Sequence, residues 1–168
     1  EATRAQFRRR GPAARGRCLE RMIFSVFPHP GRLGAMLVPL RLYQRSGLQR
    51  AVRASGFLRR FPRLAAMDAL LADIPSHEAL PELVPARGAA RGRVGLLTGC
   101  IQRHLYPGVN RDTARLLALA GWDVVIPRSQ GCCGALDLHG GRLEDFRSRA
   151  RRLAAAFPDD LDFVVTNA

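Results

Sequence analysis

Three cysteines in the second half of the chain stand where their thiols could share one site. Cys100 follows the apolar run VGLLTG, and Cys132 and Cys133 follow the apolar run DVVIP after a short loop. Because neighbouring strands of an open parallel sheet end at one crevice, we expect the three sulfurs to meet there. Thiolates are the soft ligands that iron–sulfur clusters and zinc require. The pattern therefore predicts a cluster-binding site.

Gly99 precedes Cys100, and Gly131 and Gly134 flank the pair Cys132 and Cys133. Consecutive residues of a regular strand point to opposite faces, so Cys132 and Cys133 can face one crevice only if the backbone turns. Gly131 and Gly134 supply the freedom for that turn. A helix beginning near Ala135 would place its positive end beside the thiolates. The expected metal ligands are Cys100, Cys132 and Cys133, and the expected cofactor-lining glycines are Gly99, Gly131 and Gly134.

The residues alone leave other uses of these side chains open. Free cysteines often serve as small core residues. Structural zinc is an alternative, although the C-x₂₋₄-C pairs that such sites usually use do not occur here. His104 and His139 each follow a cysteine loop, which allows a catalytic Cys–His pair, although such histidines more often face solvent. Cys18 lies in a distant helical pattern and is expected to be a packed or free thiol, so the catalytic residues stay unknown.

The elements expected around the cysteines form an α/β unit. Apolar runs predict strands over 94–98, 123–127 and 161–166, and helical spacing predicts helices over 107–120 and 143–157. This alternation predicts a parallel, doubly wound βαβαβ unit with right-handed crossovers. No G-x-G-x-x-G follows a strand, so the unit lacks the dinucleotide-binding fingerprint.

The first half of the chain has a different character. Residues 1–17 are Arg-rich and predict a solvated linker or frayed helix. Helical segments are expected over 17–27, 32–44 with a kink at Pro39, 47–55 with Ser46 as cap, and 64–71. Residues 75–93 are rich in Pro, Gly and Ala without sustained periodicity, which predicts a linker. We therefore expect an α-helical connector over 1–93 and a cysteine-rich domain over 94–168.

The formal charge of +13 would ordinarily favour nucleic acid or an acidic membrane surface as partner. Every basic residue is Arg, however, which resembles a general composition bias. The charge also lies almost wholly in residues 1–93, so the cysteine-bearing half is nearly neutral. We expect no nucleic-acid partner, with an Arg-rich nucleic-acid binder as a rival. The apolar runs fall short of the ~20 residues that span a bilayer, but a membrane-surface anchor is an alternative to packing on another domain.

The run LLTGCIQRHLYPGVNRDTARLLALAGWDVVIPRSQGCCGALDLHGG resembles the cysteine-rich CCG domain of heterodisulfide reductase subunits and related respiratory proteins. Cys100 matches the single cysteine of that pattern, and Cys132, Cys133 and Gly134 match its triplet. The stretch PLRLYQRSGLQR at 39–50 is similar to the connector before this domain in the iron–sulfur subunit of glycolate oxidase (glycolate dehydrogenase). The resemblance covers about residues 22–168.

The chain departs from that family in three ways. The family carries two ferredoxin-type C-x₂-C-x₂-C-x₃-C-P motifs, which we expect to lie before Glu1. It also carries two CCG copies, of which most of one is present. The last cysteine of this copy is expected just after Ala168, so we expect a domain truncated at its C-terminal end that is inactive alone.

The resemblance implies an iron–sulfur subunit that relays electrons from a flavin subunit oxidising glycolate, or a similar 2-hydroxy acid, towards a quinone. It implies a [4Fe–4S] cluster at the three cysteines and FAD in a partner subunit. The implied location is cytoplasmic, with peripheral attachment to the inner face of the cytoplasmic membrane as an alternative. Two other functions stay open: a CCG subunit of a lactate or glycerol-3-phosphate dehydrogenase system, and a zinc-stabilised interaction module without redox role.

Overall fold

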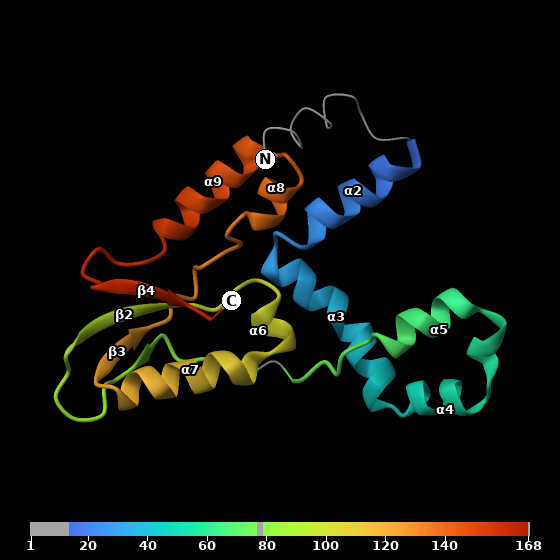
Figure 1. Ribbon diagram of the computed structural model, residues 1–168, viewed down its shortest axis with the longest axis horizontal. Helices are drawn as coiled ribbons and strands as arrows, with labels where there is room; N and C mark the ends of the chain where they lie inside the picture. The colour runs from blue at the N-terminus through green and yellow to red at the C-terminus, as the bar shows by residue number, and fades with distance from the viewer. Residues whose placement is uncertain (1–13, 77–78, 168) are drawn as a thin grey trace.

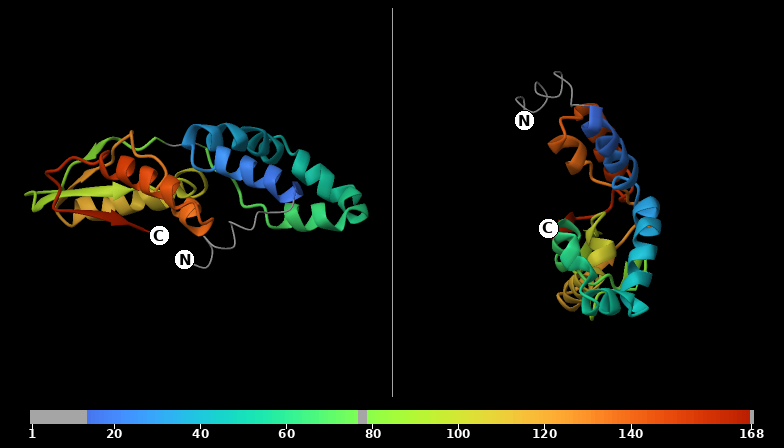
Figure 2. Two further views of the ribbon diagram at one scale, coloured as in Figure 1. Left: turned by 90° about the horizontal axis from the view of Figure 1, so that it is seen from above. Right: turned by 90° about the vertical axis from the view of Figure 1, so that its right-hand side faces the viewer.

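The computed structural model describes residues 14–76 and 79–167, with side chains from residue 18 onward. Residues 1–13 of the predicted Arg-rich linker lie outside the described residues. Figure 1 shows a helical part and a part built on a β-sheet. The two parts follow one another along the long axis of an elongated molecule (Figure 2).

The helical part follows the predicted pattern with small shifts at the ends. Its elements are α2 (Ala14–Val26), α3 (Pro30–Arg45), α4 (Leu48–Ala54), the 3₁₀ helix η1 (Phe57–Arg60) and α5 (Pro62–Ala69). The expected cap of α4 is wrong by one residue, because Gly47 is the N-cap and has a left-handed φ of 80°. Ser46 nevertheless contributes, since its Oγ accepts a hydrogen bond from the Leu48 N–H at 3.3 Å.

The sheet part alternates strands and helices as predicted. Its elements are β1 (Leu83–Val84), β2 (Gly92–Leu97), α6 (Gln102–Leu105), α7 (Pro107–Leu119), β3 (Trp122–Val125), α8 (Ala135–His139), α9 (Leu143–Ala154) and β4 (Phe163–Thr166). The four-residue helix α6 was not expected. At the end of α7, Gly121 has a φ of 90°, the left-handed conformation expected of a residue that ends a helix.

The sheet has the order β1-β3-β2-β4. β2 pairs in parallel with both neighbours, so that Val94 lies opposite Val124 on β3 and Phe163 on β4. The connections β2-α7-β3 and β3-α9-β4 run in opposite directions across the sheet. Right-handed crossovers then require opposite faces for the two helices, and Figure 1 shows α7 and α9 on opposite sides of the strands. The α/β class predicted from the sequence is confirmed.

One strand lies where the sequence analysis expected only linker. β1 pairs antiparallel with β3, with Leu83 opposite Val125, and β2 already begins at Gly92. The expectation of irregular structure over 75–93 is wrong at these positions. A two-residue strand is too short to show alternation, so only its neighbour β3 defines it. The division of the chain into domains at residue 93 stays a prediction.

Alternation along β2 divides its side chains between the two faces of the sheet. Val94 and Leu96 are fully buried and share a core with Ala114 of α7. On the other face, a Cβ at Gly95 would lie 2.8 Å from side-chain atoms of Phe157 and Leu161. Glycine therefore allows the segment after α9 to pack closely on the centre of the sheet.

The two parts of the molecule contact each other through side chains on several helices. Leu105 of α6 packs against the small core around α3, whose buried members are Leu33, Leu37 and Ile74. The Arg142 guanidinium stacks over the Phe24 ring of α2, 4.4 Å from its centre. Within residues 14–76 and 79–167, we find no helix that combines the length and the apolar character needed to cross a membrane.

Candidate metal centre

The loops after β2 and β3 bring the three cysteines of the second half together. The two strands are parallel neighbours, so their carboxyl ends lie side by side. The thiols of Cys100 and Cys132 lie near enough to shift each other's pKa, and so do those of Cys132 and Cys133. Cys132 is buried, and the other two are half-buried. The chain therefore gathers three soft donor atoms from positions far apart in the sequence.

Two of the three flanking glycines adopt a conformation that other residues avoid. Gly99 has a φ of 68° and Gly134 a φ of 83°. Gly134 is the N-cap of α8, and its N–H donates to Cys132 Sγ at 3.4 Å. Gly131 has no positive φ. The turn that aims the adjacent cysteines depends on Gly134.

Hydrogen-bonding interactions between neighbouring thiols give the three groups different pKa values. The bond from Cys132 lowers the pKa of Cys100 to about 7, against the opposing effect of burial. The same bond raises the pKa of Cys132. The bond with Cys132, followed by burial, raises the pKa of Cys133. Cys100 is therefore the first of the three to become a thiolate, the form that binds metals.

A network of buried amides ties the strand ends beneath the cysteine loops. Gln130 accepts a hydrogen bond from the Thr98 N–H at 3.0 Å and donates to the Leu96 carbonyl at 3.3 Å. Asn110 of α7 donates to the Thr98 carbonyl at 2.9 Å and accepts from Asn167, just after β4, at 3.3 Å. Gln130 and Asn110 thus do more than stabilise their own loop and helix. They join segments that lie far apart in the chain.

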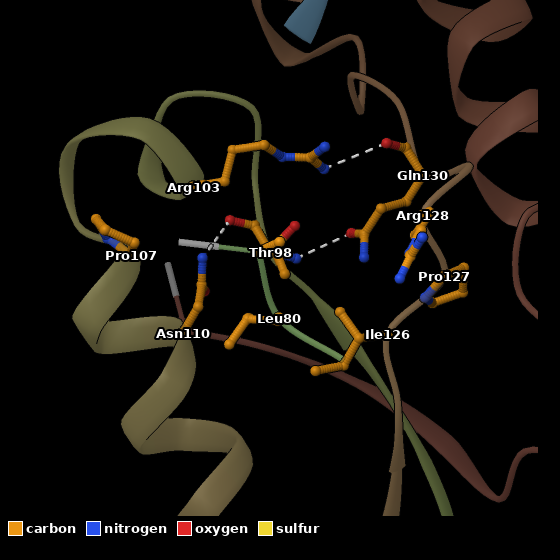
Figure 3. Close-up of a pocket in the computed structure, with 10 residues that line it drawn as sticks. Leu80, Thr98, Arg103, Pro107, Asn110, Ile126, Pro127, Arg128 and Gln130 are labelled. Carbon is orange, nitrogen blue, oxygen red and sulfur yellow. Dashed lines mark hydrogen bonds between the residues drawn. The ribbon is translucent and has the colours of Figure 1, made fainter. Parts of the chain in front are cut away.

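A cavity of about 380 Å³ opens beside this network. Figure 3 shows Thr98, Asn110 and Gln130 around it, with Arg103 reaching across to the Gln130 carbonyl. Arg103 is not among the site residues expected from the sequence. The one feature of the sequence that points to Arg103 is its position three residues after Cys100, in the turn that follows the first cysteine loop.

The other candidate residues do not join the three thiols. His104 was expected to face solvent, and this is wrong: it is 7% exposed, and its Nε2 lies 3.1 Å from the Pro30 carbonyl. It is buried because α6 turns it towards α3. His139 is exposed at the end of α8, and Cys18 is an exposed free thiol on α2.

The chemistry of the donor set fits an iron–sulfur cluster in part. Each of the three thiols has a neighbouring thiol close enough to shift its pKa, and the N–H of Gly134 already donates to one sulfur. In the described part of the chain, however, no three or more His, Cys, Asp or Glu side chains are grouped closely enough to hold a metal ion. The donors suit the cluster, while their assignment as ligands stays a prediction.

Comparison with protein-family models matches both parts of the chain. Residues 15–71 match the linker region of the glycolate oxidase iron–sulfur subunit, and residues 94–168 match the cysteine-rich domain, CCG. No solved structure matches the chain significantly.

Curated proteins with similar sequences support the same relation. The probable glycolate oxidase iron–sulfur subunit of Bacillus subtilis is 42% identical over 148 residues, which cover 85% of this chain and 33% of that protein. The glycolate oxidase iron–sulfur subunit of Escherichia coli is 44% identical over 59 residues, 35% of this chain and 14% of that protein. Lactate utilization protein A of Shouchella clausii is 36% identical over 72 residues, 43% of this chain and 30% of that protein. The chain thus spans a third or less of the length of these relatives.

Proposed function

This chain belongs to the family of glycolate oxidase iron–sulfur subunits, and on that premise we propose that the whole protein relays electrons in a complex that oxidises glycolate. The observation that carries the proposal is that three thiols follow the carboxyl ends of two neighbouring parallel strands, near enough to shift one another's pKa. Soft sulfur donors at glycine turns are what an iron–sulfur cluster requires.

In this proposal Cys100, Cys132 and Cys133 hold a [4Fe–4S] cluster, which supplies one-electron transfer when bound. Gly99, Gly131 and Gly134 let the backbone approach it. The Gly134 N–H donates to a ligand sulfur, and hydrogen bonds of this kind help to set the potential of such a site.

The proposed partners follow from the same function. Electrons come from a flavin subunit that carries FAD and oxidises the 2-hydroxy acid, and they pass to a quinone. The proposed location is the cytoplasm, with peripheral attachment to the inner face of the cytoplasmic membrane as the alternative. We propose no nucleic-acid partner, because almost all of the net positive charge of the chain lies outside the cysteine-bearing half.

The test is a cluster analysis of the full-length protein purified without oxygen. Iron, acid-labile sulfide and the EPR spectrum are compared for the wild type, the double variant Cys132→Ser/Cys133→Ser and the matched control Cys18→Ser, whose thiol is exposed on α2. We expect the double variant to lose one cluster and its signal, and the control to lose nothing. An unchanged spectrum in the double variant would refute ligation by these cysteines. Stoichiometric zinc without sulfide would favour the zinc-stabilised module.

The second candidate is a lactate-oxidising system, which the similarity to lactate utilization protein A favours. The complex reconstituted with its flavin subunits is offered glycolate, L-lactate and glycerol 3-phosphate as electron donors. We expect glycolate to reduce the iron–sulfur centres fastest. A clear preference for lactate would replace the first candidate with the second.

A further inference from the structure

One arginine fastens the two cysteine loops to each other. Arg103 lies on α6, and its Nε donates to the Gly99 carbonyl at 3.0 Å. Its second donor group, an Nη, reaches the Gln130 carbonyl at 3.2 Å, the contact drawn in Figure 3. Gly99 directly precedes Cys100, and Gln130 lies two residues before Cys132. A single rigid guanidinium therefore sets the separation of two predicted ligands.

The charge of this guanidinium acts on the same two cysteines. Arg103 is half-buried, and its electrostatic partners are Cys100 and Cys132. In the described part of the chain, we find no carboxylate paired with it. An arginine stays protonated in proteins, so a lasting positive charge faces the thiols from the edge of the cavity.

We propose that Arg103 is a positioning residue of this site, which holds Cys100 and Cys132 in register and raises the reduction potential of the cluster bound there. The proposal rests on the iron–sulfur function proposed above. One electron added at the site, from the flavin subunit or from a chemical reductant, increases the local negative charge by one without making or breaking a covalent bond. A partly buried positive charge favours that added electron more than a solvated one does.

The test is an EPR-monitored redox titration of the full-length protein with dithionite as reductant. It compares the wild type with Arg103→Gln, Arg103→Lys and the matched control Arg128→Gln. Arg128 lines the same cavity, but its side chain is 76% exposed and lies 3.8 Å from Glu82. At a fixed ambient potential, we expect Arg103→Gln to lower the ratio of reduced to oxidised cluster about tenfold, which is ~59 mV for a one-electron couple.

The two other variants distinguish the effect of the Arg103 charge from a general disruption of the site. Arg103→Lys keeps the charge but not the fork that reaches both carbonyls, so it should hold less iron than the wild type while the cluster that it does hold titrates close to the wild type. Arg128→Gln should not shift. If Arg103→Gln loses its iron, a wild-type potential in Arg103→Lys still supports the proposal. An unshifted Arg103→Gln, an equal shift in Arg128→Gln, or a shifted or empty Arg103→Lys overturns it. Absence of a cluster from the wild type would instead overturn the proposed function itself.

Discussion

At the scale of single residues, the cysteine loops depend on one backbone conformation more than on the side chains. Gly134 has a left-handed φ, begins α8 and donates its N–H to Cys132. A Cβ at this position would lie 3.1 Å from the backbone of Phe146. Gly131, on the other side of the cysteine pair, has no positive φ, and nothing lies within 4 Å of a Cβ built there. The two glycines of one motif therefore differ in how far they tolerate a side chain.

We expect Gly134→Ala to lower the free energy of unfolding by about 1–3 kcal/mol, the usual cost of a left-handed conformation in a residue with a side chain. The crowding against Phe146 adds to that cost. Gly131→Ala is the matched control and should change stability by less than about 0.5 kcal/mol, as open surface positions do. Urea unfolding followed by circular dichroism measures both. Equal effects of the two substitutions would contradict the assignment of the turn to Gly134.

At the scale of elements, one carboxylate joins three helices of the connector. Asp68 of α5 accepts hydrogen bonds from Tyr43 of α3 at 3.2 Å, from Gln49 of α4 at 3.2 Å and from Arg53 of α4 at 2.5 Å. The hydrogen bond from Arg53 is the largest cause of the lowered pKa of Asp68. These contacts place the ends of α3, α4 and α5 together, although α4 with 7 residues and α5 with 8 are too short to be stable alone.

The lowered pKa of Asp68 predicts an acid-sensitive connector. A carboxylate whose pKa is lower in the folded state stabilises that state above its unfolded pKa of about 3.9, and this contribution disappears as the pH falls through the folded pKa. We expect the thermal midpoint of the wild type to fall on acidification below pH ~4, and to fall less in Asp68→Asn. Asp73→Asn, an exposed carboxylate just beyond α5, is the control. A parallel loss in the wild type and Asp68→Asn would remove Asp68 from the explanation.

At the scale of the whole molecule, the short helix α6 connects the metal centre with the helical part. Arg103 on α6 contacts both cysteine loops. The next residue, His104, turns to the opposite side, where its ring contacts the Pro30 carbonyl and lies 3.1 Å from a Cβ built at Gly34. Leu105 then packs against the core of α3. Three consecutive side chains thus link the loop that carries Cys100 to the connector.

We expect His104→Ala to loosen this link. The Pro30 carbonyl loses a buried partner and the ring leaves a gap beside Gly34, at a cost of about 1–3 kcal/mol. Hydrogen exchange followed by mass spectrometry should show faster exchange in both α3 and α6. His139→Ala, on the exposed end of α8, should leave α3 unchanged. Protection of α3 that is the same in His104→Ala and the wild type would show that the two parts are held together elsewhere.

The sequence by itself determined the order of the three parallel strands and of the two long helices between them, and the positions of the cysteines among these elements. Apolar runs, helical spacing and the glycine beside each cysteine loop are local properties, and each is recorded within a few neighbouring residues. Parallel pairing then follows from the alternation of strand and helix, because crossovers are right-handed. For the same reason, the meeting of Cys100 with Cys132 could be predicted.

Only the tertiary structure decided which groups hold the loops of Cys100 and Cys132 next to each other. Thr98 finds its partner in Gln130, and Asn110 finds Asn167 more than fifty positions away. The strand β1 forms because it pairs with the free edge of β3, and His104 is buried because α3 covers it. Such partners are chosen by the packing of distant segments, because a buried polar group must be satisfied by whatever lies nearest in space. No local pattern in the chain records that choice.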